Sequence, residues 1–412
     1  MDIVIGAGVS GLSYSCFTKN SYLVIEKEQE IGGYCRTIKQ DGFVWDYSGH
    51  FFHFQNPDIK AFVLENINID ELCEVKKNTQ ILYKDRYIDF PFQKNIHQLE
   101  KEEFIDCLYD LFVARDDEMK NSFKNMVYSN FGKGIAEKFL IPYNQKLYAC
   151  DLDRLDSRAM GRFFPKASRE EIILNFRDSK NISYNSSFIY PKGGAIEYVN
   201  SLVKRLDSSK ISLKEEVTNI DILHKEVKTT RRTIKYDNLI STMPFPMLLD
   251  KCGIDYDPDI YTWNKVLVFN LGFDKKGDDV KNSWVYIPDP DILFYRVGYY
   301  DNILNTNKMS LYVEIGFSKD MLLSDITEYL DRTLADLRKI KIVSDQHLVS
   351  WNYVIMDPAY VHINKKSIEE VQSLKDKFAK HNVYSIGRYG SWTYCSIEDN
   401  ILEAKKLAEI VK

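Results

Sequence analysis

The chain has few cysteines and no long hydrophobic run. Its seven cysteines are scattered through 412 residues without a Cys-x-x-Cys pair, so the sequence indicates neither a zinc site nor a disulfide framework. No apolar run reaches the roughly 18 residues that a membrane-spanning helix needs. Residues 1–5 carry no basic region, and we expect no signal peptide. These absences predict a cytoplasmic protein without a membrane span.

A surplus of positive charge is also missing. The chain has 55 Lys and Arg residues against 60 Asp and Glu residues, a net charge of −5. A protein that binds nucleic acid by neutralising phosphates usually has a basic surplus or stripe, so we expect no nucleic-acid partner. Hydrophobic residues make up 44% of the chain, which excludes a disordered protein.

Three glycines near the start have the spacing of a dinucleotide-binding turn. A β-like run at residues 2–5 is followed by Gly6, Gly8 and Gly11, and then by a helical stretch to about residue 19. Gly6 permits a tight turn, Gly8 lets the backbone approach a pyrophosphate, and Gly11 lets the helix pack closely on the strand. The pyrophosphate is then expected at the helix N-terminus.

The residues that follow narrow the choice of cofactor. A second apolar run, 22–25, ends in Glu26, whose carboxylate can accept hydrogen bonds from ribose hydroxyls. A second glycine turn contains Gly33, and Arg36 follows, where it can bind a phosphate bidentately. This second turn resembles the FAD-binding amine oxidase and mutase superfamily and is unusual in NAD dehydrogenases. The resemblance implies FAD as the cofactor.

The rest of the chain alternates between helical and β-like regions. Residues 97–180 have apolar side chains at helical spacing, whereas 211–242 and 262–315 contain β-like runs. We predict an α/β protein: a Rossmann-type FAD-binding domain with a helical insert and an antiparallel β-sheet insert. The expected ranges are 1–75, 190–244 and 380–412 for the discontinuous FAD-binding domain, 97–180 for the helical substrate-binding domain, and 76–96 and 245–379 for the β-sheet substrate domain.

Six short segments, taken in order, resemble the UDP-galactopyranose mutases, and the eukaryotic branch more than the bacterial one. The segments are 46–52, 90–96, 142–148, 161–165 with 184–194, 284–297, and 387–394. A single arginine is more often in a surface ion pair, and a single tyrosine is more often in the core. The resemblance therefore depends on the six segments occurring together.

The resemblance implies a role for individual residues. The implied catalytic residues are His50, Arg162 and Arg296, with His50 beside the reactive edge of the flavin. The implied cofactor-binding residues are Gly6, Gly8, Gly11, Glu26, Gly33, Arg36, Val217, Gly387 and Arg388. The implied substrate-binding residues are Phe90, Phe92, Gln93, Tyr143, Asn144, Asn185, Tyr286, Tyr353 and Tyr394. Arginines and tyrosines of this set can hold a diphosphate, and no carboxylate cluster indicates a metal.

The resemblance also implies a reaction. A mutase of this family interconverts the pyranose and furanose forms of a UDP-sugar, and we expect that sugar nucleotide to be UDP-galactose. Such an enzyme supplies galactofuranose for cell-surface glycan biosynthesis. The implied route uses reduced FAD, whose N5 forms an adduct with the sugar while UDP leaves and later returns. NADPH or another reductant would donate the electrons, and we expect a homo-oligomer.

Two other functions stay open at this point. An FAD-dependent oxidase or dehydrogenase of the amine oxidase or protoporphyrinogen oxidase type shares the glycine turns, but it needs no set of arginines and tyrosines that holds a diphosphate. A flavin-binding regulatory protein without catalysis would have no use for these diphosphate-binding residues.

Overall fold

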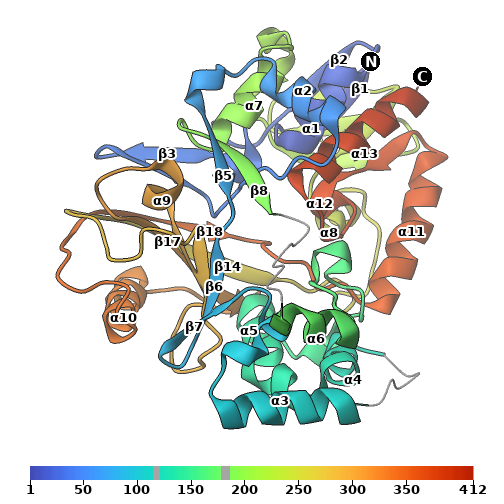
Figure 1. Ribbon diagram of the computed structural model, residues 1–412. Coiled ribbons are helices and arrows are strands. Elements are labelled where there is room, and N and C mark those ends of the chain that lie inside the picture. The colour runs from blue at the N-terminus through green and yellow to red at the C-terminus, as the bar shows by residue number, and fades with distance from the viewer. Residues whose placement is uncertain (115–120, 178–185, 412) are drawn as a thin grey trace.

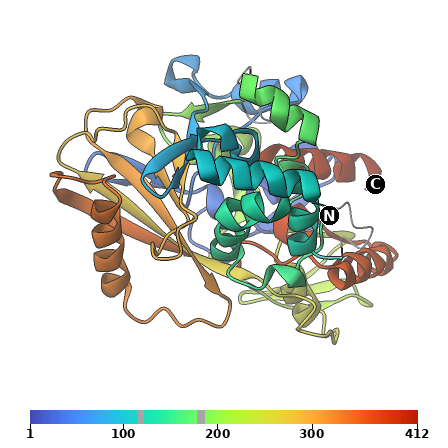
Figure 2. The same cartoon turned by 60° about the horizontal axis from the view of Figure 1, so that its bottom comes forward.

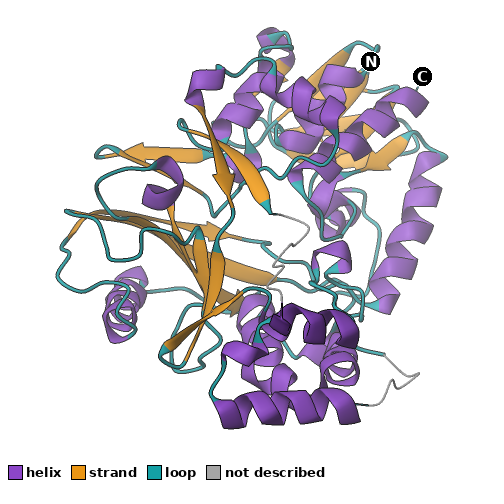
Figure 3. Ribbon diagram, in the orientation of Figure 1, coloured by secondary structure: helices purple, strands orange, loops and turns teal. Residues whose placement is uncertain are grey.

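A parallel sheet, a larger mixed sheet and a cluster of helices make up the molecule (Figure 1). The computed structural model describes residues 1–114, 121–177 and 186–411. Both termini lie beside the parallel sheet, and the helical cluster lies at the opposite end of the molecule. Figure 3 shows that most strands of the mixed sheet lie to one side of these two parts, and Figure 2 gives a second view of their arrangement.

The parallel sheet collects strands from distant parts of the chain. Its order is β19 (Val383–Ser385), β13 (Asn238–Ser241), β1 (Asp2–Ile5), β2 (Tyr22–Ile25) and β9 (Ile211–Ser212). All its pairings are parallel, and parallel sheets need cover on their faces. Helix α1 (Val9–Phe17) packs against α7 (Ile196–Val203) and α13 (Ile397–Ile410). The other elements of this part are α2 (Pro57–Leu64), α8 (Phe245–Lys251), α11 (Lys365–Ala379), α12 (Gly387–Gly390), β10 (Val217–Asp221), β11 (Glu226–Thr229) and β12 (Thr233–Lys235).

The larger sheet has seven strands and forms one wall of the site described below. Its order is β18 (Leu348–Met356), β14 (Asn264–Phe273), β17 (Ser310–Ser318), β16 (Arg296–Tyr299), β15 (Trp284–Tyr286), β6 (Thr79–Tyr83) and β7 (Arg86–Asp89). The expectation of an antiparallel sheet is wrong at one pairing, because β15 and β6 are parallel. These two strands lie far apart in the sequence, and a parallel pair requires such a long connection.

The helical cluster contains α3 (Lys101–Val113), α4 (Phe123–Ile135), α5 (Ile141–Tyr148) and α6 (Arg169–Arg177). Helices α3 and α4 approach closely at Gly134, where an added Cβ would lie 2.9 Å from the Cα of Cys107. No helix among residues 1–114, 121–177 and 186–411 is long and apolar enough to cross a membrane.

Two small ribbons connect the sheets, and one of them leads into the site. They pair β3 (Thr37–Gln40) with β4 (Phe43–Asp46), and β5 (Leu72–Lys76) with β8 (Ser187–Pro191); α9 (Tyr300–Leu304) and α10 (Ile326–Lys339) complete the elements. Asp46, at the end of β4, accepts hydrogen bonds from the Tyr190 hydroxyl at 2.7 Å and the Ala195 amide at 3.0 Å. Burial raises the pKa of Asp46 to about 6, although these hydrogen bonds oppose the rise. The loop that begins at Asp46 is therefore firmly held.

Candidate active site

The glycine turn after β1 leaves the N-terminus of α1 open. Gly8 precedes this helix, no side chain caps its free N–H groups, and its first turn carries no acidic residue. A Cβ added at Gly8 would have only the Cα of Gly33 within 4 Å, at 3.9 Å, whereas one at Gly11 would lie 2.0 Å from the Gly6 oxygen. Gly11 therefore serves close packing, and Gly8 faces space where a pyrophosphate can meet the helix N-terminus.

Three other cofactor candidates surround this turn. Glu26 accepts hydrogen bonds from the amides of Ala7 at 2.7 Å and Glu28 at 2.9 Å, which orient its carboxylate at the end of β2. Arg36 donates to the Ile31 oxygen at 3.2 Å and so braces the second glycine turn. A Cβ at Gly387 would lie 2.5 Å from the Ser10 hydroxyl oxygen, so α12 lies against the first turn of α1.

These residues fit a dinucleotide cofactor such as FAD, because they combine an open helix N-terminus with an oriented carboxylate. Val217 is also a predicted cofactor-binding residue. It lies opposite Thr229 in the small antiparallel sheet of β10, β11 and β12.

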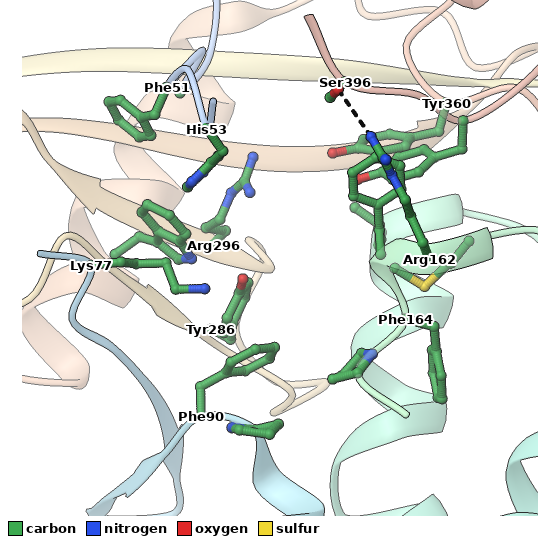
Figure 4. A pocket seen from close by; sticks show the side chains of 18 of the residues that line it. Phe51, His53, Lys77, Phe90, Arg162, Phe164, Tyr286, Arg296, Tyr360 and Ser396 are labelled. Carbon is green, nitrogen blue, oxygen red and sulfur yellow. Dashed lines mark hydrogen bonds between the residues drawn. The ribbon is translucent and has the colours of Figure 1, made fainter. Parts of the chain in front are cut away.

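A cavity of about 650 Å³ lies where the three parts of the molecule meet (Figure 4). The sequence-predicted residues that line it are His50, Phe90, Tyr143, Asn144, Arg162, Tyr286, Arg296, Arg388 and Tyr394. Arg388 follows Gly387 in α12, so a single short helix joins the cavity to the glycine turns.

The sheet wall presents two of these residues side by side. Tyr286 on β15 lies directly opposite Arg296 on β16 in the antiparallel register. Cross-strand partners project from the same face of a sheet, and Figure 4 shows both side chains at the cavity. Arg296 donates from Nε and Nη2 to the two carboxylate oxygens of Glu314, at 2.7 Å and 2.6 Å. Burial opposes the charge of Arg296, but this carboxylate raises the pKa of the guanidinium well above its usual value.

His50 lies on the loop that follows β4. Its Nδ1 lies 3.1 Å from the Ser48 oxygen, a geometry in which Nδ1 carries the proton and Nε2 is an acceptor. Burial lowers the pKa of His50 to about 4, and the charges of Arg388 and Arg296 lower it further while the Ser48 hydrogen bond opposes the change. His50 is therefore neutral at pH 7.

The helical wall supplies an amide and an aromatic pair. Asn144 on α5 donates from Nδ2 to the Leu140 oxygen at 2.7 Å, which leaves its buried Oδ1 without a partner. Tyr143 stacks on Phe139 with ring centroids 5.2 Å apart and meets Tyr286 edge to face at 5.1 Å.

Phe90 and Lys77 lie beside the sheet wall, against Tyr286 and Trp284 respectively. The Phe90 ring is 5.2 Å from the Tyr286 ring, and the Lys77 ammonium is 5.5 Å from the Phe90 centroid. Burial lowers the pKa of Lys77 to about 8, so this lysine titrates just above neutral pH.

The cavity lining carries a surplus of positive charge, even though Arg296 pairs with Glu314 and Arg162 with Asp399. Among the described lining residues, one carboxylate, Glu398, faces six cationic side chains, which are Lys77, Lys94, Arg162, Lys166, Arg296 and Arg388. Several lining atoms are buried and have no hydrogen-bond partner; they are Asn144 Oδ1, Trp284 Nε1, Tyr312 Oη and Arg388 Nε. Buried polar groups are normally paired, so the lining of this cavity fits a polar, anionic ligand.

Three predicted substrate residues stand outside this arrangement. Phe92 is fully buried against Phe139 and Tyr83, and Gln93 is fully buried with its Nε2 donating to Pro165, so neither lines the cavity. The resemblance predicts that both residues bind the substrate. The structure instead packs both into the core, close to Phe90 in the chain but outside the cavity lining. Tyr353 lies on the outer strand β18 with 43% of its surface exposed, away from the cavity lining. Asn185 lies outside the described residues.

Sequence reasoning also missed cavity residues. Tyr360 lines the cavity and stacks on Tyr394 with centroids 5.9 Å apart, and the Arg388 guanidinium lies 5.1 Å from the Tyr360 centroid. His53 and Lys77 line it too. No spacing signal distinguished these residues, because each reaches the cavity from a connection between elements.

The comparisons with known proteins agree with this architecture. Residues 4–65 match a family model described as an NAD(P)-binding Rossmann-like domain. A reduced UDP-galactopyranose mutase of known structure is 22% identical, with a TM-score of 0.91 over 100% of this chain and 93% of that chain. The chain has the fold of that mutase. The predicted fold class, a Rossmann-type domain with helices and further sheets, is thereby confirmed.

Oxidases are also similar to this chain. A putative protoporphyrinogen oxidase from Exiguobacterium sp. 255-15 is 16% identical, with a TM-score of 0.79 over 100% of this chain and 98% of that chain. Protoporphyrinogen oxidase 2, chloroplastic/mitochondrial, from Arabidopsis thaliana is 23% identical over 295 residues, which are 58% of this chain and 56% of that protein. The chain thus spans little more than half of that relative. The fold is common to flavoprotein mutases and oxidases, and the likeness to the eukaryotic mutase branch stays a prediction.

Proposed function

We propose that this protein is an FAD-dependent mutase that interconverts the pyranose and furanose forms of a UDP-sugar, with UDP-galactose as the first substrate to test. The cationic cavity beside the His50 loop carries this proposal, because it combines phosphate-binding groups with orphaned polar atoms next to the flavin-type fold. A diphosphate is the ligand that several guanidinium and ammonium groups would hold without a metal.

In this account Arg296 binds the diphosphate. Its Nε and one Nη2 proton are committed to Glu314, so three N–H groups of the guanidinium remain for phosphate oxygens. Arg162 and the hydroxyls of Tyr286 and Tyr394 act with it. The Phe90 ring stacks on the base, and Asn144 Oδ1 accepts a hydrogen bond from the nucleotide.

These groups assist the reaction by neutralising the charge of the diphosphate and by keeping the substrate in position. Reduced FAD, when bound, supplies a nucleophile at N5 toward the anomeric carbon of the sugar. Arg296 and Arg162 neutralise the diphosphate as it departs and retain it for return. The neutral imidazole of His50 would have Nε2 available to accept a hydrogen bond from a bound flavin. The residue ranges given above for the FAD-binding, helical and β-sheet domains belong to this proposal.

The test is an anaerobic assay with the purified holoenzyme. After dithionite reduction, UDP-galactofuranose should convert to UDP-galactopyranose without net consumption of reductant. The similarity to protoporphyrinogen oxidases favours one alternative, an oxidase. Oxygen uptake with a porphyrinogen, together with no UDP binding, would replace the mutase with that alternative.

A further inference from the structure

Ser48 has a backbone conformation that residues other than glycine rarely adopt. Its φ is +128°, and only 6% of its surface is exposed. Such a conformation persists only where neighbouring groups hold it. Ser48 lies two residues before His50, so the groups that hold Ser48 also set the position of the histidine.

Ser48 contacts both His50, which the proposed function places beside the flavin, and Glu314, the partner of the phosphate-binding Arg296. Its hydroxyl donates to Oε1 of Glu314, the same oxygen that accepts from Nη2 of Arg296. Its carbonyl oxygen accepts from Nδ1 of His50 at 3.1 Å and from the Tyr300 hydroxyl at 3.4 Å. One residue thus connects the imidazole to the guanidinium through Glu314, which is only 1% exposed.

The surroundings leave this loop little freedom. The Tyr300 hydroxyl also accepts from the Asp46 amide at 3.1 Å. At Gly49 an added Cβ would lie 2.6 Å from the Tyr312 hydroxyl oxygen, so the loop passes directly against β17. The strand that carries Glu314 and the loop that carries His50 are therefore packed as one body.

We propose that Ser48 and Glu314 are positioning residues that hold Arg296 and His50 as one unit, so that diphosphate binding at Arg296 is coupled to the flavin edge beside His50. This inference rests on the proposed function, because it takes UDP as the ligand of Arg296. Coupling of this kind is reciprocal: if UDP alters the flavin reduction potential, reduction alters UDP affinity by the same free energy.

A double-mutant cycle on the oxidised holoenzyme tests the first link. UDP affinity is measured by calorimetry for the wild type, Ser48→Ala, Arg296→Lys and the double variant. We expect Ser48→Ala to weaken UDP binding by about fivefold or more in the wild-type background, and by less than about twofold in the Arg296→Lys background. Equal losses in both backgrounds would overturn the inference.

Two further variants separate positioning from folding. Ser48→Gly also lacks the hydroxyl but adopts positive φ freely, so it should lose UDP affinity as Ser48→Ala does while losing less thermal stability than Ser48→Ala. Wild-type UDP affinity in Ser48→Gly would overturn the role of the hydroxyl. Ser201→Ala is the matched control, because the buried Ser201 hydroxyl donates to Val63 away from the cavity; its UDP affinity should be unchanged.

The second link is tested by the flavin midpoint potential with and without UDP. We expect UDP to shift the potential of the wild type, and Ser48→Ala and Glu314→Gln to lose most of that shift while keeping full flavin content. An unchanged shift in both variants would overturn the coupling. Failure of the wild type to bind UDP would instead remove the proposed function, and the inference with it.

Discussion

Nη2 of Arg162 lies 2.6 Å and 2.7 Å from the two carboxylate oxygens of Asp399. This ion pair joins the short turn Gly161–Phe163 to the first turn of α13, beside the cavity that Arg162 lines. Asp399 also completes the capping box of α13 with Ser396. A diphosphate that binds Arg162 therefore lies near a carboxylate of this chain, whose charge opposes its binding.

Asp399→Asn removes the competing charge and keeps a side chain that can cap α13. Exposed ion pairs contribute about 0.2–1 kcal/mol, so we expect the dissociation constant of UDP to fall by up to about fivefold. Titration calorimetry at low and high salt measures the change. Weaker UDP binding in this variant would mean that Asp399 orients Arg162 for the ligand.

Arg296→Lys keeps a cation but loses the planar fork that pairs with Glu314. We expect kcat/KM to fall about ten- to a hundredfold, equivalent to about 1.5–3 kcal/mol of a charge-assisted contact. Flavin content, read from the absorbance ratio of flavin to protein, should not change. Turnover at the wild-type rate would contradict the assignment of Arg296 to the diphosphate.

Phe90 and Phe92 should give opposite results, because the first lines the cavity and the second is core. Phe90→Ala should weaken UDP binding with little change in melting temperature. Phe92→Ala should destabilise the fold by about 3–5 kcal/mol, the usual loss for a buried phenylalanine. Urea unfolding and UDP titration of both variants measure the contrast, and equal loss of stability would refute it.

Lys77 predicts a pH dependence of UDP binding. Its lowered pKa of about 8 means that the ammonium is charged at pH 7 and neutral at pH 9. Attraction to a diphosphate is therefore present below pH 8, and affinity should fall as pH rises from 7 to 9. In Lys77→Arg the charge persists at both values, so the fall should disappear; persistence of the same fall would assign it to another group.

Tyr360 and Tyr353 form a matched pair for the phosphate-binding role. Tyr360 lines the cavity beside Arg388, whereas Tyr353 lies exposed on β18. Tyr360→Phe should weaken UDP binding, by about 0.5–1.5 kcal/mol for one lost hydrogen bond, and Tyr353→Phe should not. The reverse result from the same titration would restore Tyr353 to the site.

Local sequence patterns predicted those features of the protein that are formed by residues close together in the sequence. The spacing of Gly6, Gly8 and Gly11 indicated the turn before α1, because strand, turn and helix follow one another directly. Tyr286 and Arg296 belong to one short segment of the resemblance, 284–297, and two neighbouring antiparallel strands place them opposite each other.

Contacts set by tertiary packing could not be predicted in the same way. Phe92 and Phe90 are two residues apart, yet one enters the core and the other the cavity. Glu314 had no local signal, because its partners Ser48 and Arg296 come from separate parts of the chain. Lys77 lies in the connection between β5 and β6, and it lines the cavity where β6 pairs in parallel with β15, a strand distant in the sequence.

The most direct test of the central claim is conversion of UDP-galactofuranose by the holoenzyme without oxygen, with products separated by chromatography. We expect UDP-galactopyranose from the dithionite-reduced enzyme, no product from the oxidised enzyme, and no net use of reductant. An enzyme that binds UDP but leaves both UDP-galactose forms unchanged when reduced would contradict the choice of sugar. A reduced enzyme that binds no UDP would contradict the mutase itself.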